Sequence, residues 1–124
     1  MTFGNFTPAE LACKCGCGFM PAPDFMARVQ RLRDAVGFAL PVSSAARCPE
    51  HNAKVSHTGR TGPHTTGRAI DLKVSHEKAF AVVCEAVRLG FTGIGVNQKG
   101  DSRFVHVDDL PNAPGQPRPT VWSY

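Results

Sequence analysis

The sequence predicts an α+β fold built as one small domain. Two segments, 24–36 and 75–89, carry the signals of helices, while several shorter apolar segments carry those of strands. The predicted strands are 39–43, 68–74, 91–96 and 103–107. They do not alternate one by one with helices, which distinguishes this order from a parallel α/β fold. A chain of 124 residues can enclose a single hydrophobic core but not two, so we expect one domain over 1–124.

The N-terminal half is predicted to hold a Cys-rich irregular segment over 1–22 and then the helix 24–36. The apolar residues at helical spacing in this helix are Phe25, Val29, Leu32 and Val36. Gly37 follows as a stop signal. After the short strand 39–43, a second helix is predicted over 49–55, because its first residue is proline, which the first helical position tolerates.

The C-terminal half begins with a predicted loop over 56–63, which leads to the strand 68–74. The helix 75–89 starts at a serine, a favoured N-cap residue, and ends at Gly90. A polar turn then joins the last two strands. The tail, 111–124, is rich in proline and is expected to be extended.

Composition and charge limit the possible classes of function. Hydrophobic residues make up 42% and charged residues 19% of the chain, as in ordinary globular proteins. No apolar run reaches the roughly 18 residues of a membrane span, and the first residues lack the basic and apolar regions of a secretory signal peptide. The net charge of +4 suits an anionic polymer such as nucleic acid or bacterial cell wall, or simply a basic surface. Because basic residues are scattered and only one Tyr and one Trp occur, no nucleic-acid partner is expected.

A carboxylate interrupts one of the predicted strands. Asp71 lies within the apolar segment 68–74, where an unpaired charge would be costly. Side chains alternate along a strand, and in the later strand His106 and Asp108 share one face. If the two strands are neighbours, His64, Asp71 and His106 converge. Two imidazoles and one carboxylate, with a fourth position for water, are typical of a catalytic zinc site, although strand histidines also serve purely structural roles.

Three ordered motifs resemble one family. GPHTTGRAIDL (62–72) resembles the S-x-H-x-x-G-x-A-x-D signature of zinc D-alanyl-D-alanine carboxypeptidases and L-alanyl-D-glutamate endopeptidases, a group that includes phage endolysins. FVHVD (104–108) is similar to the segment with that family's last zinc histidine. SAARCPEHN (44–52) resembles its S-G-Y-R-x-P-x-x-N segment. The two ends of the chain, 6–18 and 118–124, also resemble those of small single-domain members.

The resemblance implies a fold and a function. The fold would be a mostly antiparallel sheet flanked by helices, as in these peptidases and the related hedgehog signalling domain. The function would be that of a hydrolase, a zinc metallopeptidase acting on peptidoglycan stem peptides, with Zn²⁺ on His64, Asp71 and His106. Arg47 would bind a substrate carboxylate or stabilise the oxyanion, with a surface salt bridge as the alternative. We expect a monomer without a membrane span, which, if a phage encodes it, stays cytoplasmic until release and then acts at the cell wall.

One position departs from the family pattern. Many members carry a catalytic Glu or Asp three residues before the last histidine, and here that residue is Arg103, which cannot act as a general base. Asp108 and Asp101 are the candidate replacements. Asp108 could instead orient a zinc histidine, and Asp101 could be an ordinary turn residue. This departure leaves open a second function, a zinc-binding module that binds the wall or a protein without hydrolysis.

The cysteines form a separate pattern. Cys13, Cys15 and Cys17 are spaced C-x-C-x-C, and Cys48 follows Arg47. These four cysteines could bind a structural metal or form disulfides, and in either case we expect a link between the N-terminal cluster and Cys48. Cys84, in the helix 75–89, is expected to be an inert buried thiol.

Overall fold

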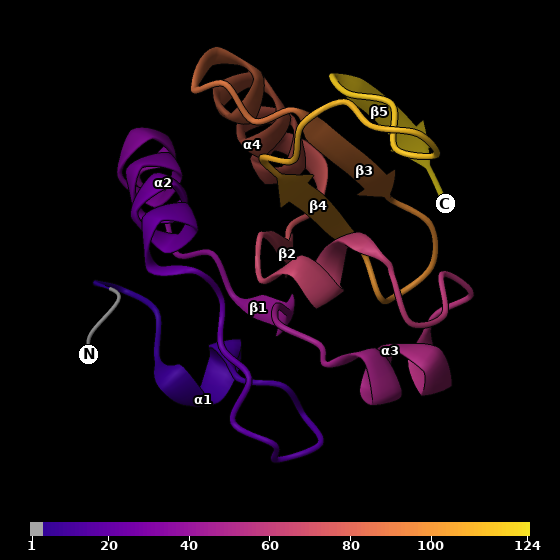
Figure 1. Ribbon diagram of the computed structural model, residues 1–124. Helices are drawn as coiled ribbons and strands as arrows, with labels where there is room; N and C mark the ends of the chain where they lie inside the picture. Colours follow the sequence, from indigo (N-terminus) through magenta and orange to yellow (C-terminus); the bar gives the residue numbers. More distant parts are fainter. Residues whose placement is uncertain (1–3) are drawn as a thin grey trace.

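The computed structural model describes residues 4–124 and contains one five-stranded sheet with helices around it (Figure 1). In chain order the elements are α1 (Pro8–Leu11), α2 (Pro23–Val36), β1 (Val42–Ser44), α3 (Pro49–Val55), the 3-10 helix η1 (Pro63–Thr66), β2 (Ala69–Leu72), α4 (His76–Arg88), β3 (Gly93–Asn97), β4 (Phe104–Asp108) and β5 (Thr120–Ser123). Residues 1–3 of the predicted segment 1–22 lie outside this description. Within 4–124, no helix combines the length and the apolar character needed to cross a bilayer.

The sheet is mostly antiparallel, which confirms the predicted α+β class. Its strand order is β1-β2-β4-β3-β5, and only the pairing of β3 with β5 is parallel. The strand β5 was not predicted, because the tail was expected only to be extended. The segment Thr120–Ser123 contains Thr, Val and Trp, which favour strands, and it pairs with the free edge of β3 (Figure 1).

The register of β2 against β4 separates a core face from a polar face. Ile70 lies opposite Val107 and Leu72 opposite Val105, and all four are fully buried. These side chains pack in one core with apolar residues of α2 and α4, including Phe25, Val29, Leu32, Val82 and Ala86. Because neighbouring residues of a strand point to opposite faces, Asp71 and His106 lie on the other side of the sheet.

The helices follow their predicted positions, with some differences. α2 ends as expected at Gly37, which adopts a left-handed φ of 77°. Ser75 is the N-cap residue of α4, but its side chain makes no capping hydrogen bond. The segment 1–22, predicted to be irregular, contains α1, which Thr7 and Glu10 stabilise by a reciprocal capping box.

The prediction for Cys84 was wrong. This side chain is exposed on α4, whereas the buried residues of the helix are Ala79, Val82 and Ala86. Cys84 is two residues from both Val82 and Ala86, which places it on the opposite face of the helix.

Candidate metal centre

The three predicted ligands come together on the polar face of the sheet. The β2–β4 register sets Asp71 directly opposite His106, and η1 brings His64 next to them. Asp71 Oδ1 lies 3.3 Å from His64 Nε2 and 3.1 Å from His106 Nδ1. All three side chains are buried, and one ligand atom from each lies within 4.8 Å of the others.

Each imidazole makes a hydrogen bond through its outer nitrogen, the one that faces away from Asp71. His64 Nδ1 lies 2.7 Å from the carbonyl oxygen of Ala45, and His106 Nε2 lies 2.7 Å from Asp108 Oδ2. In a neutral ring the outer nitrogen therefore carries the hydrogen and donates it, which leaves His64 Nε2 and His106 Nδ1 as lone-pair atoms. Both face Asp71. This arrangement of backing acceptors is the one that orients metal-binding histidines.

The donor set fits a cation. Two imidazole lone pairs and one carboxylate face one another at hydrogen-bond distance, and such acceptors repel unless a proton or a metal ion lies between them. Burial raises the pKa of Asp71, but hydrogen bonds with His106 and His64 outweigh it and hold that pKa well below its usual range. Burial opposes protonation of His106, yet its bonds to Asp108 and Asp71 raise its pKa. A divalent cation would replace that proton.

Arg47 lies beside these residues, as predicted. Its Nη2 is 3.8 Å from Asp71 Oδ2, and its backbone N–H donates to the carbonyl of His64. Its Nε atom is buried and has no hydrogen-bond partner within residues 4–124. Burial lowers the pKa of Arg47, but an arginine remains charged in this environment. The guanidinium therefore retains hydrogen-bonding capacity for an anionic group in the pocket.

Asp108 lies behind His106, on the nitrogen that faces away from Asp71. Its side chain is fully buried, and Arg118 donates to both of its oxygens, over 3.0 Å to Oδ1 and 2.9 Å to Oδ2. Burial raises the pKa of Asp108, but its bonds with His106 and Arg118 lower it further than burial raises it. Such contacts suit a carboxylate that orients a histidine, the role that the sequence analysis gave as the alternative to a general base.

Asp101 and Arg103 do not line the pocket that contains the three ligands. Asp101 is exposed in the turn between β3 and β4. Arg103 donates from Nε to the carbonyl of Gly100 and lines a separate small cavity of about 390 Å³ next to His76. The structure thus brings together His64, Asp71, His106, Asp108 and Arg47, and leaves Asp101 apart.

The tail supplies site residues that the sequence analysis missed. Besides the contact with Asp108, the Arg118 guanidinium lies 5.1 Å from the centre of the Trp122 ring, and that ring lies 5.0 Å from the His106 ring. Tyr124 also lines the pocket, and burial raises its pKa. The only sequence signal for these residues was the resemblance of 118–124 to the end of small family members, which assigned no role to any of them.

The pocket above the ligands has a volume of about 1010 Å³ and opens to solvent on one side. It is lined by Arg47 and Arg118, by the aromatic rings of Phe104, Trp122 and Tyr124, and by His57. Among residues 4–124, Asp71 is the only residue in this lining with a carboxylate side chain. The pocket therefore offers positive charge and aromatic surface to a ligand.

Two histidines and one aspartate at the floor of an open pocket are the donor set of mononuclear metal-dependent hydrolases. A family model described as Peptidase M15 matches residues 4–108, and the chain belongs to this family. The protein is thus a metallopeptidase by family. The match includes Cys13, Cys15, Cys17 and all three ligand candidates, and it ends before Arg118 and Trp122. No curated protein sequence matches the chain significantly.

Proposed function

We propose that the protein is a zinc-dependent peptidase that cleaves a peptide bond in peptidoglycan stem peptides, as a D,D-carboxypeptidase or an L-alanyl-D-glutamate endopeptidase. The observation that carries this proposal is the buried set of His64, Asp71 and His106, whose free lone pairs face one another at the floor of an open pocket. Family membership supports the reaction class. The motif resemblance supports the substrate class, and we propose that the protein acts as a monomer.

His64 Nε2, an oxygen of Asp71 and His106 Nδ1 would hold the metal. A zinc ion there would polarise the scissile carbonyl and lower the pKa of a water molecule toward about 7. The protein's own contribution is orientation, because Ala45 and Asp108 hold the two imidazoles by their outer nitrogens.

Arg47 would bind a carboxylate of the substrate. Its Nε has no partner within residues 4–124, and its planar guanidinium suits bidentate recognition of a carboxylate. Peptidoglycan stem peptides carry free carboxylates, so a pocket with two arginines and one internal aspartate suits them. Arg118 is less available, since it already donates to Asp108.

Few residues that line the pocket could act as the general base. Asp108 is occupied by His106 and Arg118, so we propose that it orients His106. Asp101 would act as base only after moving from its turn. His57 lines the pocket and is the remaining imidazole there that could take a proton. A zinc-binding module without hydrolytic activity is the second candidate function, because Asp71 is the only residue with a carboxylate side chain in the pocket lining formed by residues 4–124.

The test is incubation of the zinc-loaded protein with purified peptidoglycan, followed by mass analysis of the released fragments. We expect fragments cut next to an alanine residue, and the masses identify the bond. A chelator and His64→Ala should each abolish release, whereas His76→Ala, a histidine that does not line the pocket, should not. Binding to peptidoglycan without any release by the zinc-loaded protein would favour the non-hydrolytic module.

A further inference from the structure

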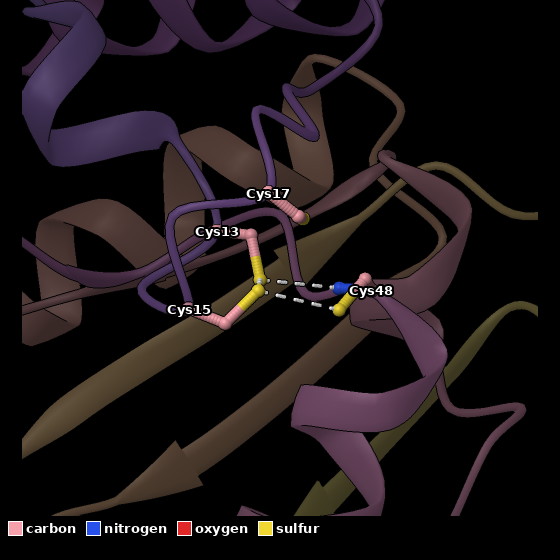
Figure 2. Close-up of side chains that lie close together, drawn as sticks. All are labelled: Cys13, Cys15, Cys17 and Cys48. Carbon is pink, nitrogen blue, oxygen red and sulfur yellow. Dashed lines mark hydrogen bonds between the residues drawn. The ribbon is translucent and has the colours of Figure 1, made fainter.

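A second group of metal-binding side chains lies away from the pocket. Cys13, Cys15 and Cys17 lie on the loop after α1, and Cys48 directly precedes α3. Figure 2 shows the side chains of Cys13 and Cys15 pointing toward Cys48. Their sulfur atoms lie 3.4 Å (Cys13 to Cys15) and 3.6 Å (Cys15 to Cys48) apart, and one sulfur from each of the four cysteines lies within 4.8 Å of the others.

These distances match a metal site better than a disulfide. A disulfide requires sulfur atoms about 2.05 Å apart, and all four cysteines are free thiols in this structure. Zinc bound by four thiolates has Zn–S distances of about 2.3 Å, and in a regular tetrahedron this separates the sulfurs by about 3.8 Å. The two measured separations need only a small expansion to reach that value. Four thiolate ligands suit zinc, which takes tetrahedral sulfur coordination in structural sites.

The backbone around the cluster supports thiolate ligands. The N–H of Cys48 donates to Cys13 Sγ over 3.3 Å, and the N–H of His51 donates to Cys48 Sγ over 3.4 Å. Hydrogen bonds of this kind stabilise the anionic sulfur that binds a metal. Two ligands from different parts of the chain thus already have their supporting donors.

The loop is also folded so that its sulfurs face Cys48. The N–H of Cys13 donates to the carbonyl of Phe19, and the N–H of Gly16 donates to the carbonyl of Cys13. Gly16 and Gly18 adopt φ values of 85° and 91°, which other residues rarely tolerate. The sequence C-K-C-G-C-G therefore makes a tight turn in which Cys17 lies between two glycines.

We propose that Cys13, Cys15, Cys17 and Cys48 bind a structural zinc ion, separate from the metal held by His64, Asp71 and His106. The ion would link the N-terminal loop to the residue next to Arg47. Ala46 already donates its N–H to the carbonyl of Leu11, so two successive contacts would tie this strand end to the N-terminal segment. The cysteine site does not depend on the proposed peptidase function; only its effect on the position of Arg47 does.

The experiment is a metal count on the full chain, purified under reducing conditions without chelator. We expect about two zinc ions per chain in the wild type and one in the double variant His64→Ala/His106→Ala. Cys15→Ser and Cys48→Ser should each lose one zinc and keep the other. Cys84→Ser is the matched control, because this exposed thiol lies outside the cluster, and it should keep both ions.

Two further measurements keep the proposal testable if a cysteine variant fails to fold. X-ray absorption at the zinc edge of the double histidine variant should show four sulfur neighbours at about 2.3 Å. Cobalt substitution of the same variant should give thiolate-to-metal charge-transfer bands. A double histidine variant without zinc, or with iron in its place, would overturn the proposal, as would disulfides among the four cysteines. Failure of the wild type to cleave peptidoglycan would count against the peptidase function alone, because the double histidine variant tests the cysteine site without it.

Discussion

Replacement of Asp108 by asparagine tests how the metal centre is supported. In the wild type the carboxylate accepts four hydrogen bonds: one from His106 over 2.7 Å, two from the Arg118 guanidinium over 3.0 and 2.9 Å, and one from the Leu110 backbone N–H over 3.3 Å. An amide keeps a single acceptor oxygen and places an NH₂ group against one of these donors. Asp108→Asn therefore loses at least one charge-assisted hydrogen bond.

The size of the effect follows from that loss. A hydrogen bond to a charged group contributes roughly 1.5–3 kcal/mol, which corresponds to about 10–100-fold in a binding constant. If Asp108 holds His106 in the correct tautomer, this factor should appear in the affinity for zinc. Turnover measured at saturating zinc should then fall little. A general base would behave differently, because its removal costs about 10²–10⁴ in rate while the metal stays bound.

The assay is a zinc titration against a chromophoric chelator, combined with peptidoglycan turnover at saturating zinc. Arg118 loses its carboxylate in this variant, and an unpaired buried charge costs about 3–5 kcal/mol, so both measurements are made where circular dichroism shows a fully folded protein. Asp101→Asn is the control and should match the wild type in both. A large loss of turnover with unchanged zinc affinity in Asp108→Asn would refute the orienting role and identify Asp108 as the base. The same result in Asp101→Asn would give that role to the turn.

The remaining predictions concern Arg47, the cysteine site and the proton on His106. Arg47→Gln should raise KM for a stem peptide about 10–100-fold with a smaller change in kcat, because it removes charge-assisted hydrogen bonds to a substrate carboxylate; an unchanged KM would exclude that contact. Cys15→Ser should lower the melting temperature by about 10 °C, because Cys15 and Cys48 are 33 residues apart and a cross-link closing such a loop contributes roughly 2–4 kcal/mol. Cys84→Ser should leave the melting temperature unchanged. Equal melting temperatures of Cys15→Ser and Cys84→Ser would contradict a metal cross-link between Cys15 and Cys48. In the metal-free protein the pKa of His106 is raised, so its protonation stabilises the fold fully below about pH 6.5, and this contribution is lost as pH rises through the folded pKa. Zinc must displace that proton, so zinc affinity should increase with pH over the same window. Calorimetry in two buffers measures the proton release. An affinity for zinc that does not depend on pH would show that His106 is not a ligand.

Much of the candidate metal centre could be predicted from local sequence. Alternation of faces along a strand put Asp71 on the side away from Ile70 and Leu72, and the same rule put His106 and Asp108 together. The structure has this arrangement, with Asp71 opposite His106. The helices 24–36 and 75–89 could likewise be predicted, because the hydrophobic periodicity and the end signals that define each helix lie within its own segment.

Local patterns could not decide what depends on distant parts of the chain. The hydrogen bonds of Asp108 include those from Arg118, which reaches it from the tail, and the tail is positioned by the pairing of β5 with β3. The exposure of Cys84 depends on which face of α4 meets the core. The approach of Cys48 to the N-terminal loop was expected, but the sulfur separations that favour a metal over a disulfide are known only from the fold. Side-chain periodicity extends over a few residues, whereas strand pairing and burial depend on which distant segments of the chain pack together. Only the tertiary structure could therefore settle these points.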